Sequence, residues 1–165
     1  MIKALPTTCI LLTFLVSCVP GGGNYRDGWR NGWFYNKDDR AKIVRTAKRY
    51  LGVKYKNGGT SPRGFDCSGY VMYVYEKNGI LLPRSVKSQY NAGKKIGPRQ
   101  RKPGDLVFFK TSKRKRYSHV GIYVGDNRFI HAPRTGKRIS FAELDNPYWR
   151  KRYIGAATFM GTGRM

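Results

Sequence analysis

Between residues 39 and 51, apolar side chains recur with the three- and four-residue spacing of one helix face. Lysines and arginines fill most of the other positions. The apolar positions are Ile43, Val44, Ala47, Tyr50 and Leu51. Asp38 or Asp39 can cap the start of this helix, and Gly52 can end it. The pattern predicts a helix that packs one face on the core and exposes a basic face.

Two more helices are predicted further along the chain. One runs from about Asp66 to Lys77 and ends at an Asn-Gly pair, and a short one covers Ser85 to Ala92. The segment from Tyr55 to Gly64 contains Asn-Gly-Gly and Ser-Pro, which are turn signals. We therefore expect a loop there, leading directly into the start of the second helix.

Short apolar runs bounded by turn residues dominate the second half of the chain and predict β-strands. The runs lie at residues 106–109, 119–124, 128–132, 138–141 and 153–160. Helices come first and strands follow, which is the order of an α+β fold with a mostly antiparallel sheet. A chain of 165 residues without an internal repeat is expected to form one domain.

The predicted hairpin at residues 119–132 contains both histidines of the chain. If residues 125–127 form its loop, Gly121 lies opposite His131. His119 is two residues from Gly121, so both imidazoles would point to the same face as diagonal neighbours. A two-residue loop would instead place them on opposite faces.

The first residues have the character of an export signal. Lys3 precedes an apolar run from Cys9 to Val16, too short to span a bilayer but typical of the apolar part of a secretory signal. The run leads into Leu15-Val16-Ser17-Cys18, which resembles a bacterial lipobox, and a glycine-rich stretch follows. This pattern predicts that the chain is exported and lipidated at Cys18.

The interpretation divides the chain into a lipoprotein signal peptide at 1–17, a lipidated N-terminus with a flexible tether at 18–37, and a domain at 38–165. Acyl chains on Cys18 would hold the protein on a membrane, provided that more than one is attached. The alternative is an ordinary cleaved signal peptide beside which Cys18 stands by coincidence.

The charge of the chain is strongly basic. It has 33 Lys and Arg against 9 Asp and Glu, a net charge of +24. Such an excess attracts polyanions, which include nucleic acid, anionic membranes and the carboxylates and phosphates of a bacterial envelope. A nucleic-acid partner would not explain the export signal. We expect the basic loop 110–116 to have a specific role, such as holding a substrate carboxylate.

Cysteine usage isolates one thiol. Cys9 would be removed with the signal and Cys18 would carry lipid, which leaves Cys67 without a disulfide partner. Cys67 lies at the predicted start of a helix, where unpaired N–H groups favour a thiolate. His119 could take its proton, and His131 could orient His119. The alternatives are an inert buried cysteine and a metal site, which is the weaker candidate because only three ligands and no metal-type pair of cysteines are present.

Four sequence motifs together resemble the NlpC-type cell-wall endopeptidases, the NlpC and p60 family of papain-like cysteine peptidases. They are Phe65-Asp66-Cys67-Ser68-Gly69, Pro103 to Phe109, His119 to Gly125, and Phe129 to Ala132. The resemblance covers roughly residues 39–159. It implies a papain-like fold in which the N-terminal helices pack on the sheet.

The resemblance also implies roles for individual residues. Cys67 would be the nucleophile, His119 the base and His131 the orienting residue. Tyr55 would shape the site. Asp66 and Ser68 would bind the free amine of the substrate, a role that some members of the family assign to these positions.

The expected function is hydrolysis of amide bonds in peptidoglycan stem peptides or their cross-links, without a metal or other cofactor. We expect a monomer in the bacterial envelope, lipid-anchored at the periplasmic face of the outer membrane because Val19 is not aspartate. Nucleic acid is not an expected partner. The alternatives are a non-catalytic envelope-binding lipoprotein and a permuted papain-like acyltransferase or amidase, in which the histidine usually precedes the cysteine.

Overall fold

The structure, a computed structural model, describes residues 37–161. The predicted signal peptide, the lipidation at Cys18 and the tether up to residue 36 lie outside the described residues. No helix among residues 37–161 is long and apolar enough to cross a membrane.

The three predicted helices are present. They are α1 (Lys37–Lys48), α2 (Cys67–Glu76) and α3 (Val86–Ala92). The start of α1 was predicted wrongly, because Asp38 and Asp39 lie inside its first turn, where their charges still favour the helix dipole. The helix also ends before Leu51, and the chain then turns through Gly52, which has a φ of +84°.

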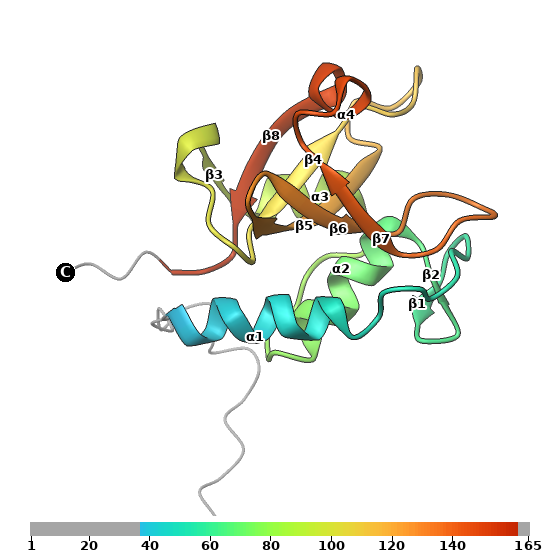
Figure 1. Ribbon diagram of the computed structural model, residues 1–165, viewed down its shortest axis with the longest axis horizontal. Coiled ribbons are helices and arrows are strands. Elements are labelled where there is room, and N and C mark those ends of the chain that lie inside the picture. The colour runs from blue at the N-terminus through green and yellow to red at the C-terminus, as the bar shows by residue number, and fades with distance from the viewer. Residues whose placement is uncertain (1–36, 162–165) are drawn as a thin grey trace, which may run out of the picture. The chain divides into compact units, whose positions relative to one another are not determined.

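The strands form one six-stranded antiparallel sheet in the order β3-β8-β4-β5-β6-β7, so the predicted α+β class is confirmed (Figure 1). Its strands are β3 (Lys94–Ile96), β4 (Leu106–Phe109), β5 (His119–Gly125), β6 (Arg128–His131), β7 (Ser140–Glu143) and β8 (Tyr153–Thr158). Four short elements were not predicted: β3, a 3₁₀ turn (Pro98–Gln100), helix α4 (Pro147–Arg152), and a hairpin of β1 (Thr60–Ser61) and β2 (Gly64–Phe65) inside the expected loop.

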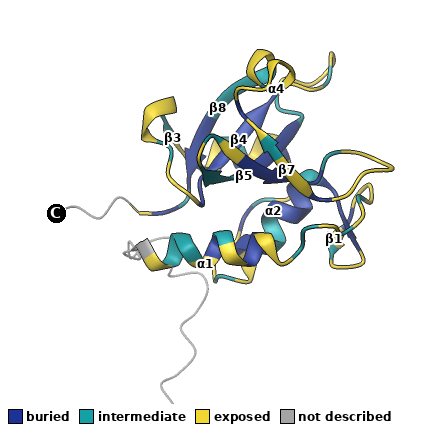
Figure 2. Cartoon of the chain, in the orientation of Figure 1, coloured by how far each residue is buried: buried dark blue, intermediate teal, exposed yellow. Residues whose placement is uncertain are grey.

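Both faces of the sheet are covered. Strand β4 is buried along its whole length, and its side chains alternate between two clusters. Leu106 and Phe108 face helices α1 and α2, whereas Val107 and Phe109 face a smaller cluster with Trp149 of α4. In Figure 2 the central strands and α2 are accordingly the most buried parts, whereas the edge strands β3 and β7 and the connecting loops are largely exposed.

The β5–β6 hairpin differs from its predicted form. Its loop has two residues, Asp126 and Asn127, both with positive φ, and Gly125 pairs with Arg128. The register then shifts between Tyr123 and Gly125, as in a β-bulge. The bulge adds one residue to β5. Tyr123 consequently pairs with Phe129, which is the pairing that the predicted three-residue loop would also have produced. The predicted loop was therefore wrong, but the predicted register near the histidines is correct.

Candidate active site

The start of helix α2 is fixed by Asp66. Its backbone is extended, and its carboxylate accepts a hydrogen bond of 2.7 Å from the N–H of Gly69. Its own N–H donates to the carbonyl of Gly59 at 3.0 Å. A Cβ at position 69 would lie 2.1 Å from that carbonyl oxygen, so only glycine fits there. These contacts place Cys67 as the first residue of the helix.

The Cys67 thiol is free and only partly exposed. Protein atoms crowd its sulfur, and this burial, followed by the negative charge of Asp66, raises the pKa of Cys67 to about 11. The N–H groups of Ser68, Val120 and Cys67 act in the opposite direction but do not outweigh the burial. The predicted net lowering of the thiol pKa by the helix start is therefore wrong. At neutral pH the resting residue is a thiol.

The two histidines form a hydrogen-bonded pair. The Nε2 atom of His119 lies 2.8 Å from the Nδ1 atom of His131, and both side chains are buried. Burial lowers the pKa of His119 to about 4. It also lowers the pKa of His131 to about 2, with a further contribution from His119. Both imidazoles are therefore neutral at pH 7, which is the form that can accept a proton.

The start of β5 brings His119 beside the start of α2. The N–H of Val120, the residue after His119, acts on the Cys67 sulfur, and α2 packs against β5. Because Nε2 of His119 is engaged by His131, Nδ1 is the nitrogen left for the thiol. When Nε2–H donates to His131, Nδ1 is the unprotonated acceptor.

Trp149 covers the histidine pair and was missed in the sequence analysis. Its ring stacks on His119 with centroids 5.3 Å apart and meets the edge of His131 at 4.9 Å. It comes from α4, which begins at an Asn146 cap followed by Pro147. This Asn-Pro pair could have indicated the helix, but nothing local indicated that Trp149 reaches the histidines.

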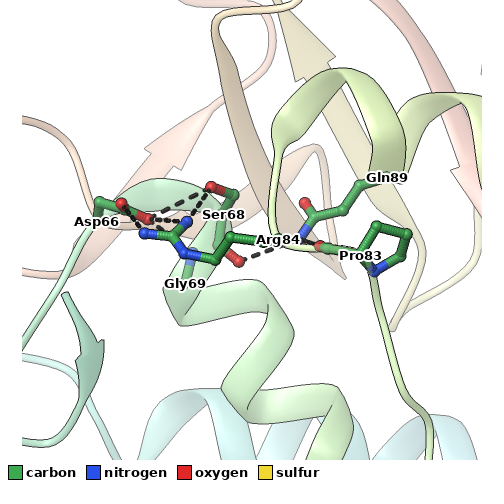
Figure 3. A network of polar contacts seen from close by, with 6 residues as sticks. All are labelled: Asp66, Ser68, Gly69, Pro83, Arg84 and Gln89. Carbon is green, nitrogen blue, oxygen red and sulfur yellow. Dashed lines mark hydrogen bonds and ion pairs between the residues drawn. The ribbon is translucent and has the colours of Figure 1, made fainter. Parts of the chain in front are cut away.

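Arg84 is the second residue that sequence reasoning missed. Figure 3 shows its guanidinium against Asp66 and Ser68, with both terminal nitrogens bound to the Asp66 carboxylate. It also donates to the Ser68 hydroxyl at 2.8 Å, and that hydroxyl donates to Asp66 at 3.3 Å. Buried Gln89 of α3 ties the segments together by donating to the carbonyls of Ser68 and Pro83. The two expected amine-binding residues thus already share a cation.

Tyr55 lies near the same group of residues. Its backbone is held by a hydrogen bond from its N–H to the Lys137 carbonyl at 2.9 Å and by a bridge to Phe65. Burial raises the pKa of its hydroxyl, and the negative charge of Asp66 adds to the shift. Tyr55 is therefore a protonated hydrogen-bond donor beside the thiol.

Residues 110–113 of the basic loop line a different hollow. Lys110 and Lys113 line this hollow of about 320 Å³ together with Lys151 and Arg152. None of the residues discussed above lines that hollow. Within residues 37–161, no group of three or more His, Cys, Asp or Glu side chains is placed to hold a metal ion.

Removing Arg84 is expected to make the thiol less reactive. In Arg84→Ala, Asp66 keeps its charge beside Cys67 but loses its counter-charge, so the thiol pKa rises. We expect alkylation of Cys67 by iodoacetamide at pH 7.5 to slow roughly threefold to tenfold. Arg84→Lys should recover part of the rate. In an Asp66→Asn background the Arg84→Ala change should have no effect, and an equal slowing there would contradict the electrostatic explanation.

Comparison with known proteins places the fold and the site in one family. A model of the NlpC/P60 family matches residues 52–158. The gamma-DL-glutamyl hydrolase of Bacillus subtilis is 43% identical over 119 residues, which cover 71% of this chain and 29% of that protein. The murein DD-endopeptidase MepH of Escherichia coli is 41% identical over 133 residues, which cover 73% of this chain and 49% of that protein.

The chain spans less than half the length of each of these two relatives. Among solved structures, a protein of the NLP/P60 family from Staphylococcus aureus, described as similar to lipoprotein, matches with a TM-score of 0.71 and 37% identity. That match covers 79% of this chain and 44% of the other. The predicted papain-like fold is thereby confirmed, and the chain belongs to the NlpC/P60 family.

Proposed function

We propose that this chain is a cysteine-type peptidoglycan hydrolase, an endopeptidase that cleaves amide bonds in stem peptides or their cross-links. The observation that carries the proposal is the 2.8 Å bond between His119 and His131 next to a free thiol at a helix start. The names of the relatives, a glutamyl hydrolase and a murein endopeptidase, support the substrate class.

In the proposed reaction His119 acts first as a base. Its Nδ1 takes the thiol proton while the Cys67 sulfur bonds to the carbonyl carbon of the substrate. Since thiol and imidazole are both neutral at rest, this transfer accompanies the attack rather than preceding it. The free N–H groups in the first turn of α2 can donate to the oxyanion that forms.

His119 then acts as an acid. Its new proton passes to the amide nitrogen, the carbon–nitrogen bond breaks, and the amine leaves with Cys67 acylated. His119 then takes a proton from water while the water oxygen bonds to the thioester carbon. The carbon–sulfur bond breaks, the acyl half leaves as a carboxylic acid, and His119 returns the proton to the sulfur. His131 accepts from Nε2–H throughout and holds the ring in the required tautomer.

The acyl side of the substrate would lie at Tyr55, Asp66 and Ser68. A substrate ammonium that binds there must share the Asp66 carboxylate with Arg84. The charges of Asp66 and Arg84 cancel, so the site supplies hydrogen-bond acceptors but little net charge. The protonated Tyr55 hydroxyl supplies a donor at the same place. These assignments follow the family resemblance and the network in Figure 3.

We also propose that the protein acts from a membrane surface in the envelope as a lipid-anchored monomer, at the outer membrane. The Leu15-Val16-Ser17-Cys18 sequence supports lipidation at Cys18, and Val19 supports the outer membrane. The lipoprotein-like description of the Staphylococcus aureus relative is in line with this anchoring.

The proposed function is tested by digestion of purified muropeptides, linear and cross-linked, with product identification by mass spectrometry. We expect one class of stem-peptide amide bond to be cut, with Cys67→Ala protein as the blank. If neither linear nor cross-linked muropeptides are cut but the protein binds them, the chain is a binding module instead.

A further inference from the structure

A hollow is lined by His131 of the histidine pair and by no residue of the Arg84 network. Its volume is about 590 Å³, and His131 and Trp149 form part of its wall. The loop between β6 and β7 forms the opposite wall, and strand β7 contributes Phe141, whose side chain is 40% exposed. We call this hollow the His131 groove.

The His131 groove is basic and has no acidic residue in its lining. Arg134, Lys137 and Arg138 all line it. Arg138 donates to the Gly52 carbonyl at 2.9 Å, which anchors the loop. In the described part of the chain, Arg134 and Lys137 have no carboxylate partner, and both residues are exposed. Two unneutralised cations thus stand beside apolar Trp149 and Phe141.

The position of the leaving amine indicates which half of the substrate the groove would contact. The amine leaving group must reach the nitrogen of His119 that protonates it, so the leaving half of the substrate lies over the histidines. Beyond His119 comes His131, which lines the groove. The acyl half lies at Asp66 and Ser68, neither of which lines the groove. The groove is therefore a hollow beside His131 into which the leaving half can extend.

We propose that the His131 groove binds a free carboxylate on the residue that supplies the leaving amine, with Arg134 and Lys137 as its specificity-determining cations. The aliphatic part of that residue would contact Trp149 and Phe141. This inference rests on the proposed function, because it assigns the leaving-group side of that reaction. It also moves the expected carboxylate-binding role from the loop 110–116 to the loop that contains residues 133–138.

The test uses two stem peptides that contain the bond identified by mass spectrometry and differ only in that carboxylate, which is either free or converted to a carboxamide. We expect the full chain to cleave the free acid with a kcat/KM roughly tenfold higher, mainly through KM, since a charge-assisted contact is lost in the amide. In Arg134→Gln/Lys137→Gln the two peptides should be cleaved almost equally.

A matched control removes the same charges elsewhere. Lys113→Gln/Arg114→Gln also exchanges one lysine and one arginine, in the loop beside the other hollow. It should keep the preference for the free acid. Loss of the preference in this control would show a general field effect and overturn the assignment, as would equal cleavage of both peptides by the unaltered chain.

Binding measurements test the role of the groove independently of the proposed function. Calorimetry with Cys67→Ala protein measures the affinities of both peptides without turnover. A stronger binding of the free acid that disappears in Arg134→Gln/Lys137→Gln supports the groove even if no bond is cut, which would overturn the proposed function alone. Equal affinities for the two peptides overturn the groove whether or not the chain is a hydrolase.

Discussion

The His119→Ala substitution is expected to reduce kcat/KM on muropeptides about as severely as Cys67→Ala, by on the order of 10⁴-fold or more. The reason is the neutral resting state. With a thiol pKa near 11 there is almost no thiolate at neutral pH, so attack depends on a base that removes the proton. His119, with its unengaged Nδ1, is the base that the structure supplies.

Substitutions at His131 test its role in orienting His119 separately from the proton transfer that His119 performs. His131→Ala leaves the base in place but removes the partner of Nε2, so we expect a smaller loss of roughly 10²-fold to 10³-fold. His131→Asn retains a hydrogen-bonding side chain and should recover part of that loss. Circular dichroism of each variant must match the parent. If His119→Ala kept more than a tenth of the parent activity, the role of His119 as base would be refuted.

The protein is expected to lose stability steeply on mild acidification. Both histidines have a pKa in the fold, about 4 and about 2, that lies below the unfolded value of about 6.5. The unfolded chain therefore binds more protons below pH 6.5, and the free energy of unfolding falls as the pH drops towards 4. Two such groups lower it by on the order of 3 kcal/mol between pH 7 and pH 5.

Urea unfolding at pH 7, 6 and 5 measures this change directly. His131→Asn removes one of the two titrating groups, so the dependence of the unfolding free energy on pH should weaken by about half. A free energy of unfolding that stayed constant from pH 7 to pH 5 would mean that the histidines protonate freely in the folded protein.

Local sequence was a good guide wherever neighbouring residues decide the structure. The start of the second helix was predicted at about Asp66, and α2 begins at the next residue because the aspartate binds a free N–H in the first turn. Strand β4 was predicted with its correct bounds because an apolar run between turn residues has few alternatives. The helix–strand order in turn gave the fold class, since it limits how the layers can pack.

The site depended on information that no local pattern contains. The β5–β6 register was predicted from a loop that does not exist, and only the bulge after Tyr123 brings His131 opposite Gly121. Arg84 and Trp149 reach the site from turns and helices that are distant along the chain. Their identity as arginine and tryptophan was visible in the sequence, but their partners were not.

The sequence by itself therefore determined the family, through four motifs that resemble it. It also determined the helix that presents Cys67 and the two candidate histidines, because these follow from residue type, capping and periodicity. Only the tertiary structure decided the electrostatic state of the site. Burial keeps the thiol and both imidazoles neutral, Trp149 packs on the imidazoles, and Arg84 neutralises Asp66. Desolvation and ion pairing depend on which atoms surround a group in space, and a linear sequence does not specify those neighbours.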